Sequence, residues 1–222
     1  MNYGVIVFPG SNCDMDCYHA VKDELKEKVQ YIWHDEGILP KGLDMIIIPG
    51  GFSYGDYLRC GAIAKFAKIM PEIIRFAKNG GYVIGICNGF QILTESGMLP
   101  GALLRNQYQK FICKNINLKV MNNKSVYTKK YKTGDILTVP IAHGEGRFFI
   151  DNDGLKELED NEQIAFKYVD EVGSETDQAN PNGSLNSIAG IFNRKKNVLG
   201  MMPHPERCNF FNKKSLQILS MN

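Results

Sequence analysis

The sequence predicts an α/β protein whose central sheet is open and mostly parallel, with helices on both faces and an antiparallel extension. Two observations support this. In the first half, short apolar segments alternate with longer amphipathic ones, as in sheets that are buried on both faces. In the second half, apolar segments follow one another without long helical segments between them, which is typical of antiparallel strands. We expect residues 1–222 to form a single domain.

The first half is expected to contribute the parallel part of the sheet. Four short segments rich in apolar or β-branched residues are expected to be strands: residues 3–8, 29–33, 45–48 and 82–86. Three segments have the spacing of helices with one buried face: residues 14–26, 63–78 and 90–95. Pro71 interrupts the second of these. A new helix should begin there, because proline fits the first turn of a helix but not its interior.

The second half is expected to extend the sheet. Four strands are expected here, with no long helix between them: residues 110–120, 136–142, 164–169 and 187–192. Residues 198–202 form a further apolar segment, which Pro203 ends. Residues 174–184 are rich in turn-forming residues and should lie in a surface loop. Residues 214–220 are expected to form a short last helix, and the sequence leaves open whether it is peripheral to the fold.

Composition and charge exclude several classes of protein. A formal net charge of +2 favours neither a nucleic-acid nor a membrane partner. The sequence begins without the features of a signal peptide, and no apolar run approaches the ~20 residues that span a bilayer. We therefore expect a cytoplasmic protein with reduced thiols. Cys13 and Cys17 precede His19 closely, but no second pair stands at zinc-ligand spacing, so no metal site is expected.

The segment G-I-C-N-G, residues 85–89, is the strongest candidate for chemistry. It lies between an expected strand and an expected helix, which is the setting of a nucleophile elbow with a thiol in place of a hydroxyl. The sharp turn requires small neighbours and places Cys87 at the amino end of the helix, where the helix dipole favours a thiolate. The alternative is a buried, inert cysteine, because cysteine is among the most buried residue types.

A histidine and a glutamate late in the chain are candidates to complete a triad. A cysteine nucleophile needs a base to move its proton, and the base needs a group that orients it. His204 and Glu206 lie two residues apart, and flanking prolines favour an extended backbone, in which such side chains point the same way. We expect Glu206 to hold the imidazole while its other nitrogen faces Cys87. A surface histidine in a loop is the alternative.

Two glycines after the third expected strand are candidates for a further part of the active site. Gly50 and Gly51 expose backbone amides at the carboxyl edge of a parallel sheet, where open α/β folds bind ligands. These amides are candidates for an oxyanion hole. By itself, a pair of glycines after a strand usually indicates only a turn.

Together and in this order, the motifs P-G-G-F, G-I-C-N-G and H-P-E resemble those of the class I, or triad-type, glutamine amidotransferases, and the resemblance covers essentially the whole chain. It implies a flavodoxin-like sheet and hydrolysis of L-glutamine through a cysteine thioester. Cys87 would be the nucleophile, His204 the proton carrier and Glu206 its orienting group. The amides of Gly51 and Asn88 would hold the oxyanion.

The same resemblance implies a set of substrate-binding residues. They are Gly50, Phe52, Gln91, Arg105 and Asn106. Of these, Gln91 has support from local spacing, because it lies one helical turn beyond the nucleophile.

Four stretches are similar to one branch of this family, the glutaminase subunits of phosphoribosylformylglycinamidine synthase, an enzyme of purine biosynthesis. They are residues 8–14, 52–62, 143–147 and 180–184. Each also has a simpler interpretation as a turn or loop. The resemblance implies that residues near the third strand and in the 143–147 segment control access to the site or dock a partner: Arg59, His143, Glu145 and Arg147.

The resemblance also implies partners. Amide transfer needs ATP to activate the acceptor oxygen, and this chain has neither a P-loop nor a dinucleotide-binding glycine motif. No cofactor is therefore expected in this chain. ATP and Mg²⁺ are expected on a large synthetase subunit, which a small accessory subunit would accompany. Ammonia should pass through an enclosed path, because bulk water would protonate it.

Three other functions remain open from the sequence. A free-standing cysteine hydrolase of the same fold, such as a γ-glutamyl peptidase, would act without a partner. An amidotransferase subunit of another synthetase would serve a different acceptor. A binding or regulatory module would keep the fold without the activity, although the intact Cys87, His204 and Glu206 are evidence against it.

Overall fold

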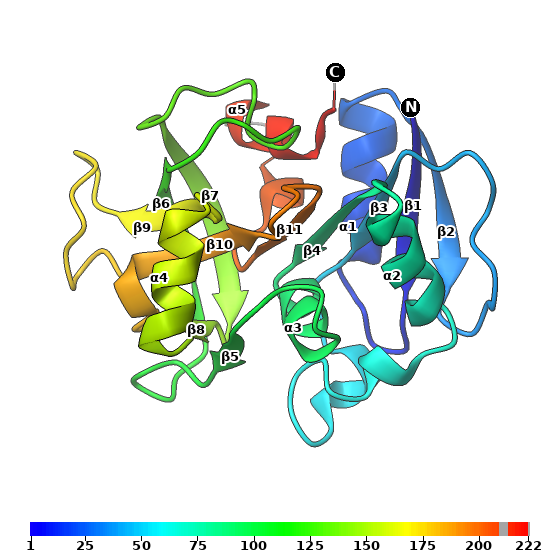
Figure 1. Ribbon diagram of the computed structural model, residues 1–222, viewed down its shortest axis with the longest axis horizontal. Coiled ribbons are helices and arrows are strands. Elements are labelled where there is room, and N and C mark those ends of the chain that lie inside the picture. The colour runs from blue at the N-terminus through cyan, green and yellow to red at the C-terminus, as the bar shows by residue number, and fades with distance from the viewer. Residues whose placement is uncertain (209–212, 222) are drawn as a thin grey trace.

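The computed structural model describes residues 1–208 and 213–221. Within these residues the main sheet has nine strands, of which the first part is parallel and the second antiparallel (Figure 1). This arrangement confirms the predicted fold class. In the described part of the chain, no helix is both long and apolar enough to cross a membrane.

The parallel part of the sheet comes from the first half of the chain and one late strand. Its strands lie in the order β2 (Lys28–Trp33), β1 (Asn2–Val7), β3 (Met45–Ile48), β4 (Tyr82–Ile86) and β11 (Val198–Met201). The beginning of this order, 2-1-3-4, is that of flavodoxin-like sheets. The chain crosses over between β1 and β3, so the loops that follow these strands form the crevice where such folds bind ligands.

The antiparallel extension continues from β11. Its strands lie in the order β10 (Ile188–Phe192), β9 (Ile164–Val169), β6 (Ile112–Val120) and β7 (Ile136–His143). These strands match the predicted ones to within two residues at each end. β10 and β9 are buried along their whole length, which explains why their sequences are almost continuously apolar.

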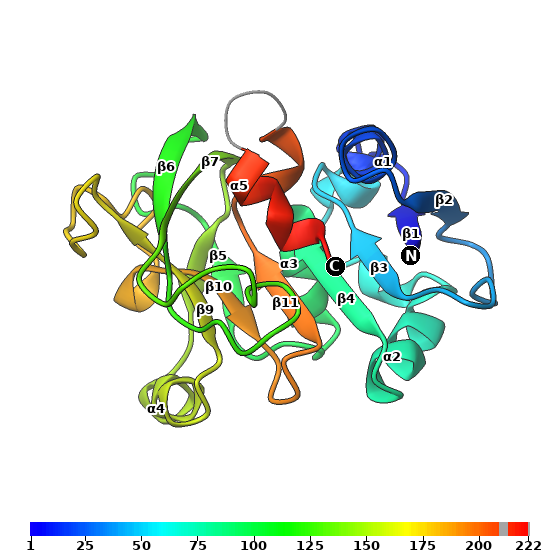
Figure 2. The same ribbon diagram turned by 90° about the horizontal axis from the view of Figure 1, so that it is seen from above.

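Helices cover both faces of the parallel part, as predicted. Seen from above, α1 (Asp14–His19) lies on one face and α2 (Met70–Lys78) on the other (Figure 2). α1 continues as a π-helical turn, Ala20–Glu24, so the helix ends two residues before its predicted boundary. Pro71 lies in the first turn of α2, as expected. The third helix, α3 (Asn88–Glu95), packs against β4 and β11.

One α-helix and two strands were not predicted. α4 (Asn152–Asp160) interrupts the second half, which was expected to lack a long helix, and β5 (Ala102–Leu104) pairs with β8 (Arg147–Phe149) in a separate small sheet. The sequence did not predict α4 because the helix is mostly polar and buries only Leu158. Its amino end is capped by the Asp151 side chain, which accepts a hydrogen bond from Gly154 N.

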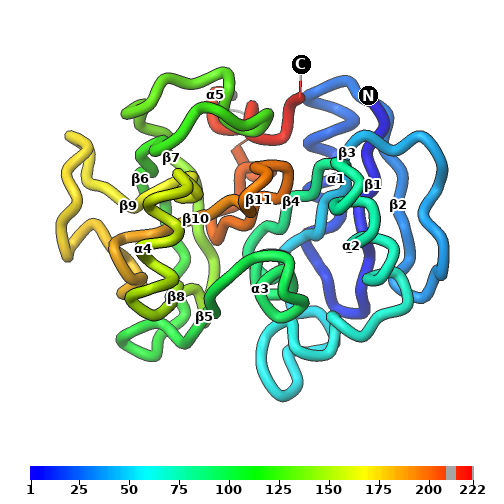
Figure 3. The backbone as a smooth tube through the Cα atoms, in the orientation of Figure 1, coloured from blue at the N-terminus to red at the C-terminus, as the bar shows by residue number. Residues whose placement is uncertain are grey.

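The last helical segment belongs to the core, a question that the sequence left open. It consists of α5 (Lys213–Leu216) and a 3₁₀ turn at Gln217–Leu219, and Leu216, Ile218 and Leu219 are buried. Leu219 O accepts a hydrogen bond of 3.0 Å from the Tyr3 hydroxyl. The carboxyl-terminal segment therefore lies close to the first strand, at the same end of the molecule (Figure 3).

Because of the register of the central strands, three loops begin next to one another at the same edge of the sheet. Ile48 of β3 pairs with Gly85 of β4, and Met201 of β11 pairs with Ile86. The approach of α3 to β3 is also close, because a Cβ atom at Gly89 would lie 2.0 Å from Ile48 O. The loops after β3, β4 and β11 therefore leave the sheet side by side.

Replacing Gly89 tests this close approach. We expect Gly89→Ala to lower the free energy of unfolding by about 1–3 kcal/mol or more, because the added methyl group meets a backbone carbonyl that cannot turn away. Urea denaturation measures the change. Gly37→Ala is the matched control, since a Cβ there meets nothing within 4 Å. Equal stability of the two variants would contradict the steric argument.

Candidate active site

Cys87 occupies a strained turn between β4 and α3. Its φ of 51° and ψ of −107° are unusual for a residue with a side chain, and such strain costs on the order of 1–3 kcal/mol. The backbone around it is firmly held. Cys87 N donates to Met201 O at 2.8 Å, and Cys87 O accepts from Phe90 N and Gln91 N. This is the geometry of a nucleophile elbow, as the sequence predicted.

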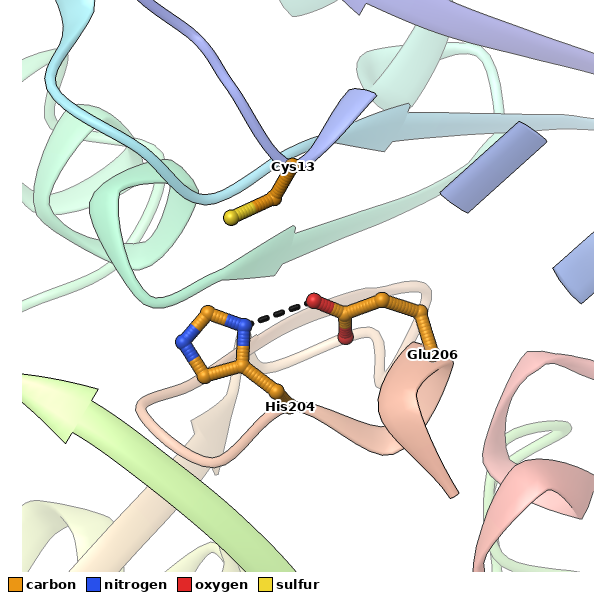
Figure 4. A group of neighbouring side chains, drawn as sticks. All are labelled: Cys13, His204 and Glu206. Carbon is orange, nitrogen blue, oxygen red and sulfur yellow. Dashed lines mark hydrogen bonds and ion pairs between the residues drawn. The ribbon is translucent and has the colours of Figure 1, made fainter. Parts of the chain in front are cut away.

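His204 lies in the segment that follows β11, close to Cys87. His204 N donates to Pro140 O at 2.9 Å, which anchors the segment beyond β11 to β7. His204 Nδ1 lies 2.6 Å from Glu206 Oε1, and the two residues are only 1% and 0% exposed (Figure 4). The predicted pairing is therefore present. Its predicted cause was wrong, because Pro205–Arg207 form a 3₁₀ turn rather than an extended segment.

The imidazole and the thiol meet above Gly50. A Cβ atom at Gly50 would lie 2.8 Å from His204 Cε1 and 3.3 Å from Cys87 Cβ, so no larger residue fits there. Burial disfavours a charged imidazole, but the negative charges of Glu206 and Cys87 outweigh it and raise the pKa of His204 well above its usual value. His204 Nε2 makes no hydrogen bond of good geometry within the described residues.

A cavity of about 370 Å³ opens over the nucleophile. Its wall includes several of the residues predicted to act on or bind a substrate: Cys87, His204, Gly51, Phe52, Gln91 and Glu145. The thiol is therefore accessible to a small ligand although its residue is buried. The cavity has the size of a site for a single small molecule.

The glycine loop after β3 is positioned by the loop after β1. Gly51 has a φ of +125°, and a Cβ atom there would lie 2.5 Å from Asn12 N, so this position requires glycine. Phe52 N donates to Gly10 O at 2.9 Å. The stretch of residues 8–14 therefore supports the glycine loop, a role that its interpretation as an ordinary turn did not include.

Asn88 connects the glycine loop to the elbow. Its side-chain oxygen accepts from Ser53 N at 3.1 Å, and its side-chain nitrogen donates to Gln91 Oε1 at 2.9 Å. As the first residue of α3, it has a backbone N–H with no acceptor inside the helix. That the backbone amides of Gly51 and Asn88 form an oxyanion hole stays a prediction. The positions of both residues are compatible with it.

Gln91 and Glu145 lie together in the cavity wall. Gln91 Nε2 donates to the backbone oxygen of Glu145 at 2.6 Å, which ties α3 to the 143–147 segment. The Glu145 carboxylate lies 3.4 Å from Arg105 Nε. Arg105 is exposed and reaches the edge of the cavity through this ion pair.

Asn106 does not fit its predicted role as a substrate ligand. It is buried, and its side-chain nitrogen already donates to Lys110 O and His143 O, while its oxygen accepts from Gly146 N. Both of its side-chain N–H groups and one acceptor position of its oxygen are therefore used inside the protein. We assign Asn106 to holding the loop after β5 against the segment that follows β7.

His143 also differs from expectation. It was grouped with residues for access or docking, but it is buried in the cavity wall, with Nδ1 3.2 Å from Asn106 Oδ1. Burial, assisted by the positive charge of His204, lowers the pKa of His143 to about 4, so the ring is neutral at neutral pH. Arg59, by contrast, is exposed and pairs with Glu95, and Arg147 is half-buried in β8.

Several residues of the cavity wall were not expected there, among them Cys13, Asp56 and Cys60. Cys13 was considered only as part of a C-x-x-x-C pair, yet it lines the cavity while Cys17 is buried in the core. Asp56 and Cys60 also line the cavity. Burial raises the pKa of Asp56 and also that of Cys60, whose thiol interacts with the Asp56 carboxyl. No local spacing signals these placements, because each depends on contacts between distant loops.

The buried, neutral His143 should make stability fall in acid. Its folded pKa lies below its unfolded value, so the unfolded state binds a proton that the folded state refuses between pH 6.5 and about 4. We expect the free energy of unfolding to fall by on the order of 2–3 kcal/mol more from pH 7 to 4.5 in the wild type than in His143→Gln. Urea denaturation at both pH values measures this. The exposed His19→Gln should behave like the wild type, and equal falls in His143→Gln and the wild type would refute the assignment.

Comparison with known proteins identifies the family. Residues 2–218 match the family described as CobB/CobQ-like glutamine amidotransferase domain. The chain is similar to the solved structure of PurLQS from Thermotoga maritima, with 40% identity and a TM-score of 0.84 over 99% of this chain and 96% of that one.

Two more distant likenesses concern the fold alone. A glutamine amidotransferase from Thermotoga maritima is 17% identical, with a TM-score of 0.60 over 93% of this chain and 76% of that one. The glutaminase domain of CTPS from Trypanosoma brucei is 13% identical, with a TM-score of 0.59 over 100% of this chain and 92% of that one. Since the family match spans almost the whole chain and the likeness at 40% identity is full-length, the protein belongs to the CobB/CobQ-like glutamine amidotransferases.

Proposed function

We propose that the chain is the glutaminase subunit of phosphoribosylformylglycinamidine synthase. It would hydrolyse L-glutamine and pass the ammonia to a synthetase subunit that converts formylglycinamide ribonucleotide to formylglycinamidine ribonucleotide in purine biosynthesis. The observation that carries this proposal is the buried triad in which Cys87 and His204 line one cavity and Glu206 pairs with His204, in a chain that is 40% identical to PurLQS over nearly its full length.

The first half of the reaction forms a thioester. The Cys87 sulfur attacks the side-chain amide carbon of glutamine, and the amide oxygen gains negative charge. The backbone N–H groups of Gly51 and Asn88 donate to that oxyanion. His204, held by Glu206, gives a proton to the amide nitrogen, so that the C–N bond breaks and ammonia leaves.

The second half releases glutamate. His204, now neutral, takes a proton from a water molecule, which attacks the thioester carbon. The same two amides hold the second oxyanion, and its collapse breaks the C–S bond and regenerates the thiolate. The buried Glu206 carboxylate contributes to both halves of the reaction. It keeps His204 in one tautomer, and its negative charge stabilises the charged imidazole.

The cavity offers charges that match an amino acid. Glutamine carries an ammonium and a carboxylate on its α-carbon, and Glu145 and Arg105 form an ion pair at the edge of the cavity. We assign Glu145 to the α-ammonium and Arg105 to the α-carboxylate. Gln91, one helical turn from the nucleophile, keeps Glu145 in place by donating a hydrogen bond to the backbone oxygen of Glu145.

The loop after β3 is the proposed contact with the synthetase subunit. Its exposed side chains include apolar ones, notably Tyr57 and Leu58, which are 73% and 91% exposed. The loop also contributes Asp56 and Cys60 to the cavity wall, so a partner that covers it would cover the cavity too. ATP and Mg²⁺ would bind the synthetase subunit, a small accessory subunit would complete the assembly, and the complex would work in the cytoplasm.

Replacing the nucleophile separates ammonia supply from ammonia use. We expect Cys87→Ala to reduce glutaminase activity at least about a thousandfold, while its complex with the synthetase still forms product from ammonium salts. Glutamate release and product formation measure the two activities. His204→Ala should lose more glutaminase activity than Glu206→Gln, because the latter keeps the base. Loss of ammonia-dependent synthesis in Cys87→Ala would show that the chain does more than supply ammonia.

The docking surface predicts partner-dependent activity. The synthetase subunit should stimulate the glutaminase, and Leu58→Glu should weaken both binding to the synthetase and this stimulation. Calorimetric titration and glutamate release measure them. Val172→Glu is the matched control, since Val172 is also apolar and 83% exposed but lies in a loop beyond β9. Equal glutaminase rates with and without the synthetase would favour a free-standing hydrolase instead.

A further inference from the structure

A chain of hydrogen bonds joins the glycine loop to the amino end of α3. Ser53 N, which follows the glycine loop, donates to Asn88 Oδ1 at 3.1 Å. Asn88 Nδ2 in turn donates to Asp56 Oδ1 at 3.1 Å. Ser53 and Asn88 are only 2% and 1% exposed, whereas Asp56 is half-buried and lines the cavity. The Asp56 carboxylate is therefore the end of a buried chain that connects the two loops of the proposed oxyanion hole.

The Asn88 side-chain amide can make these bonds in one orientation only. Its nitrogen donates to Asp56 and also to Gln91 Oε1, at 2.9 Å, while its oxygen accepts from Ser53 N. If the amide turned over, its N–H groups would face the N–H of Ser53 and its oxygen would face the Asp56 carboxylate. Asp56 is the stronger of the two constraints, because an ionised carboxylate offers only acceptors, whereas the Gln91 amide offers both an acceptor and donors.

The backbone that carries Asp56 has an unusual conformation. Tyr54, Asp56 and Leu58 have φ angles of 53°, 55° and 69°, in the left-handed region that residues with side chains rarely adopt. Tyr54 fixes this segment, because its N–H donates to Pro9 O at 2.6 Å and its hydroxyl lies 2.6 Å from His34 Nδ1. Such strain persists only where the surroundings enforce it, and it clusters at functional sites. Here it accompanies the contact of Asp56 with a buried side chain.

We propose that Asp56 is a positioning residue of the glutaminase. It acts through Asn88, whose orientation keeps the glycine loop and the elbow at the distance at which the backbone N–H groups of Gly51 and Asn88 bind one oxyanion. The inference rests on the proposed function, because it concerns a step of glutamine hydrolysis. The oxyanion exists in the transition state rather than in bound glutamine, so the loss of Asp56 should lower kcat and leave KM nearly unchanged.

Amide hydrogen exchange tests the positioning without reference to activity. In Asp56→Ala, the Ser53 N–H should exchange at least about tenfold faster than in the wild type, because the Asn88 amide is then free to turn. In Asp56→Asn it should exchange as in the wild type, since the new side-chain oxygen accepts the same hydrogen bond. Asp35→Ala is the matched control, because Asp35 is an exposed carboxylate that pairs with Lys68. Circular dichroism confirms that each variant is folded.

Glutaminase kinetics of the chain bound to its synthetase give the second measurement. Asp56→Ala should lower kcat at least about tenfold and change KM for glutamine less than about threefold, because small misplacements of catalytic groups are costly. Asp56→Asn should keep at least about a third of the wild-type kcat, because it keeps the acceptor. In an Asn88→Ala background, Asp56→Ala should change kcat less than about twofold, since the interaction that it removes is already absent.

The outcomes separate this inference from its rivals. Equal exchange of the Ser53 N–H in Asp56→Ala and the wild type would overturn the proposal, and so would an effect on kcat that is undiminished in the Asn88→Ala background. A higher KM in both Asp56 variants would overturn it in favour of direct binding of the glutamine ammonium by the carboxylate. The expected exchange pattern in a wild-type complex without glutaminase activity would overturn the proposed function alone. An active complex in which Asp56→Ala changes neither exchange nor kcat would overturn the positioning role alone.

Discussion

The active centre depends on β4 being held in register between β3 and β11. This pairing ends three strands at the same level, so that the glycine loop, the nucleophile and the histidine meet although they come from distant parts of the chain. The hydrogen bond from Cys87 N to Met201 O joins the elbow directly to the strand that precedes His204. The strain at Cys87, on the order of 1–3 kcal/mol, persists because the surrounding sheet and helix fix both of its neighbours.

The two histidines in the cavity wall have pKa values that are shifted in opposite directions by their surroundings. His204 has a carboxylate partner and a sulfur nearby, and their charges raise its pKa despite burial. His143 lies next to the neutral Asn106, and burial, assisted by the positive charge of His204, lowers its pKa to about 4. Environments that shift two such groups in opposite directions are a common basis for assigning an acid–base role to one of them. Here the charged ring is the one that faces Cys87.

A second thiol, that of Cys13, also lines the cavity. Cys13 reaches this place because the loop after β1 packs against the glycine loop, where Cys13 N donates to Gly50 O at 3.4 Å. The loop that supports the proposed oxyanion hole therefore also places a second thiol in the cavity wall.

Local patterns in the sequence determined the strands, most helices, the elbow at Cys87 and the pairing of His204 with Glu206, because strand period, turn chemistry and short spacing are properties of neighbouring residues. They failed at α4, whose polar sequence buries one residue, and left open the place of the last helix, whose burial depends on the first strand. Only the tertiary structure decided that Asn106 is consumed by internal hydrogen bonds and that Cys13 enters the cavity. Both outcomes follow from packing between segments far apart in the chain, which no short-range pattern encodes.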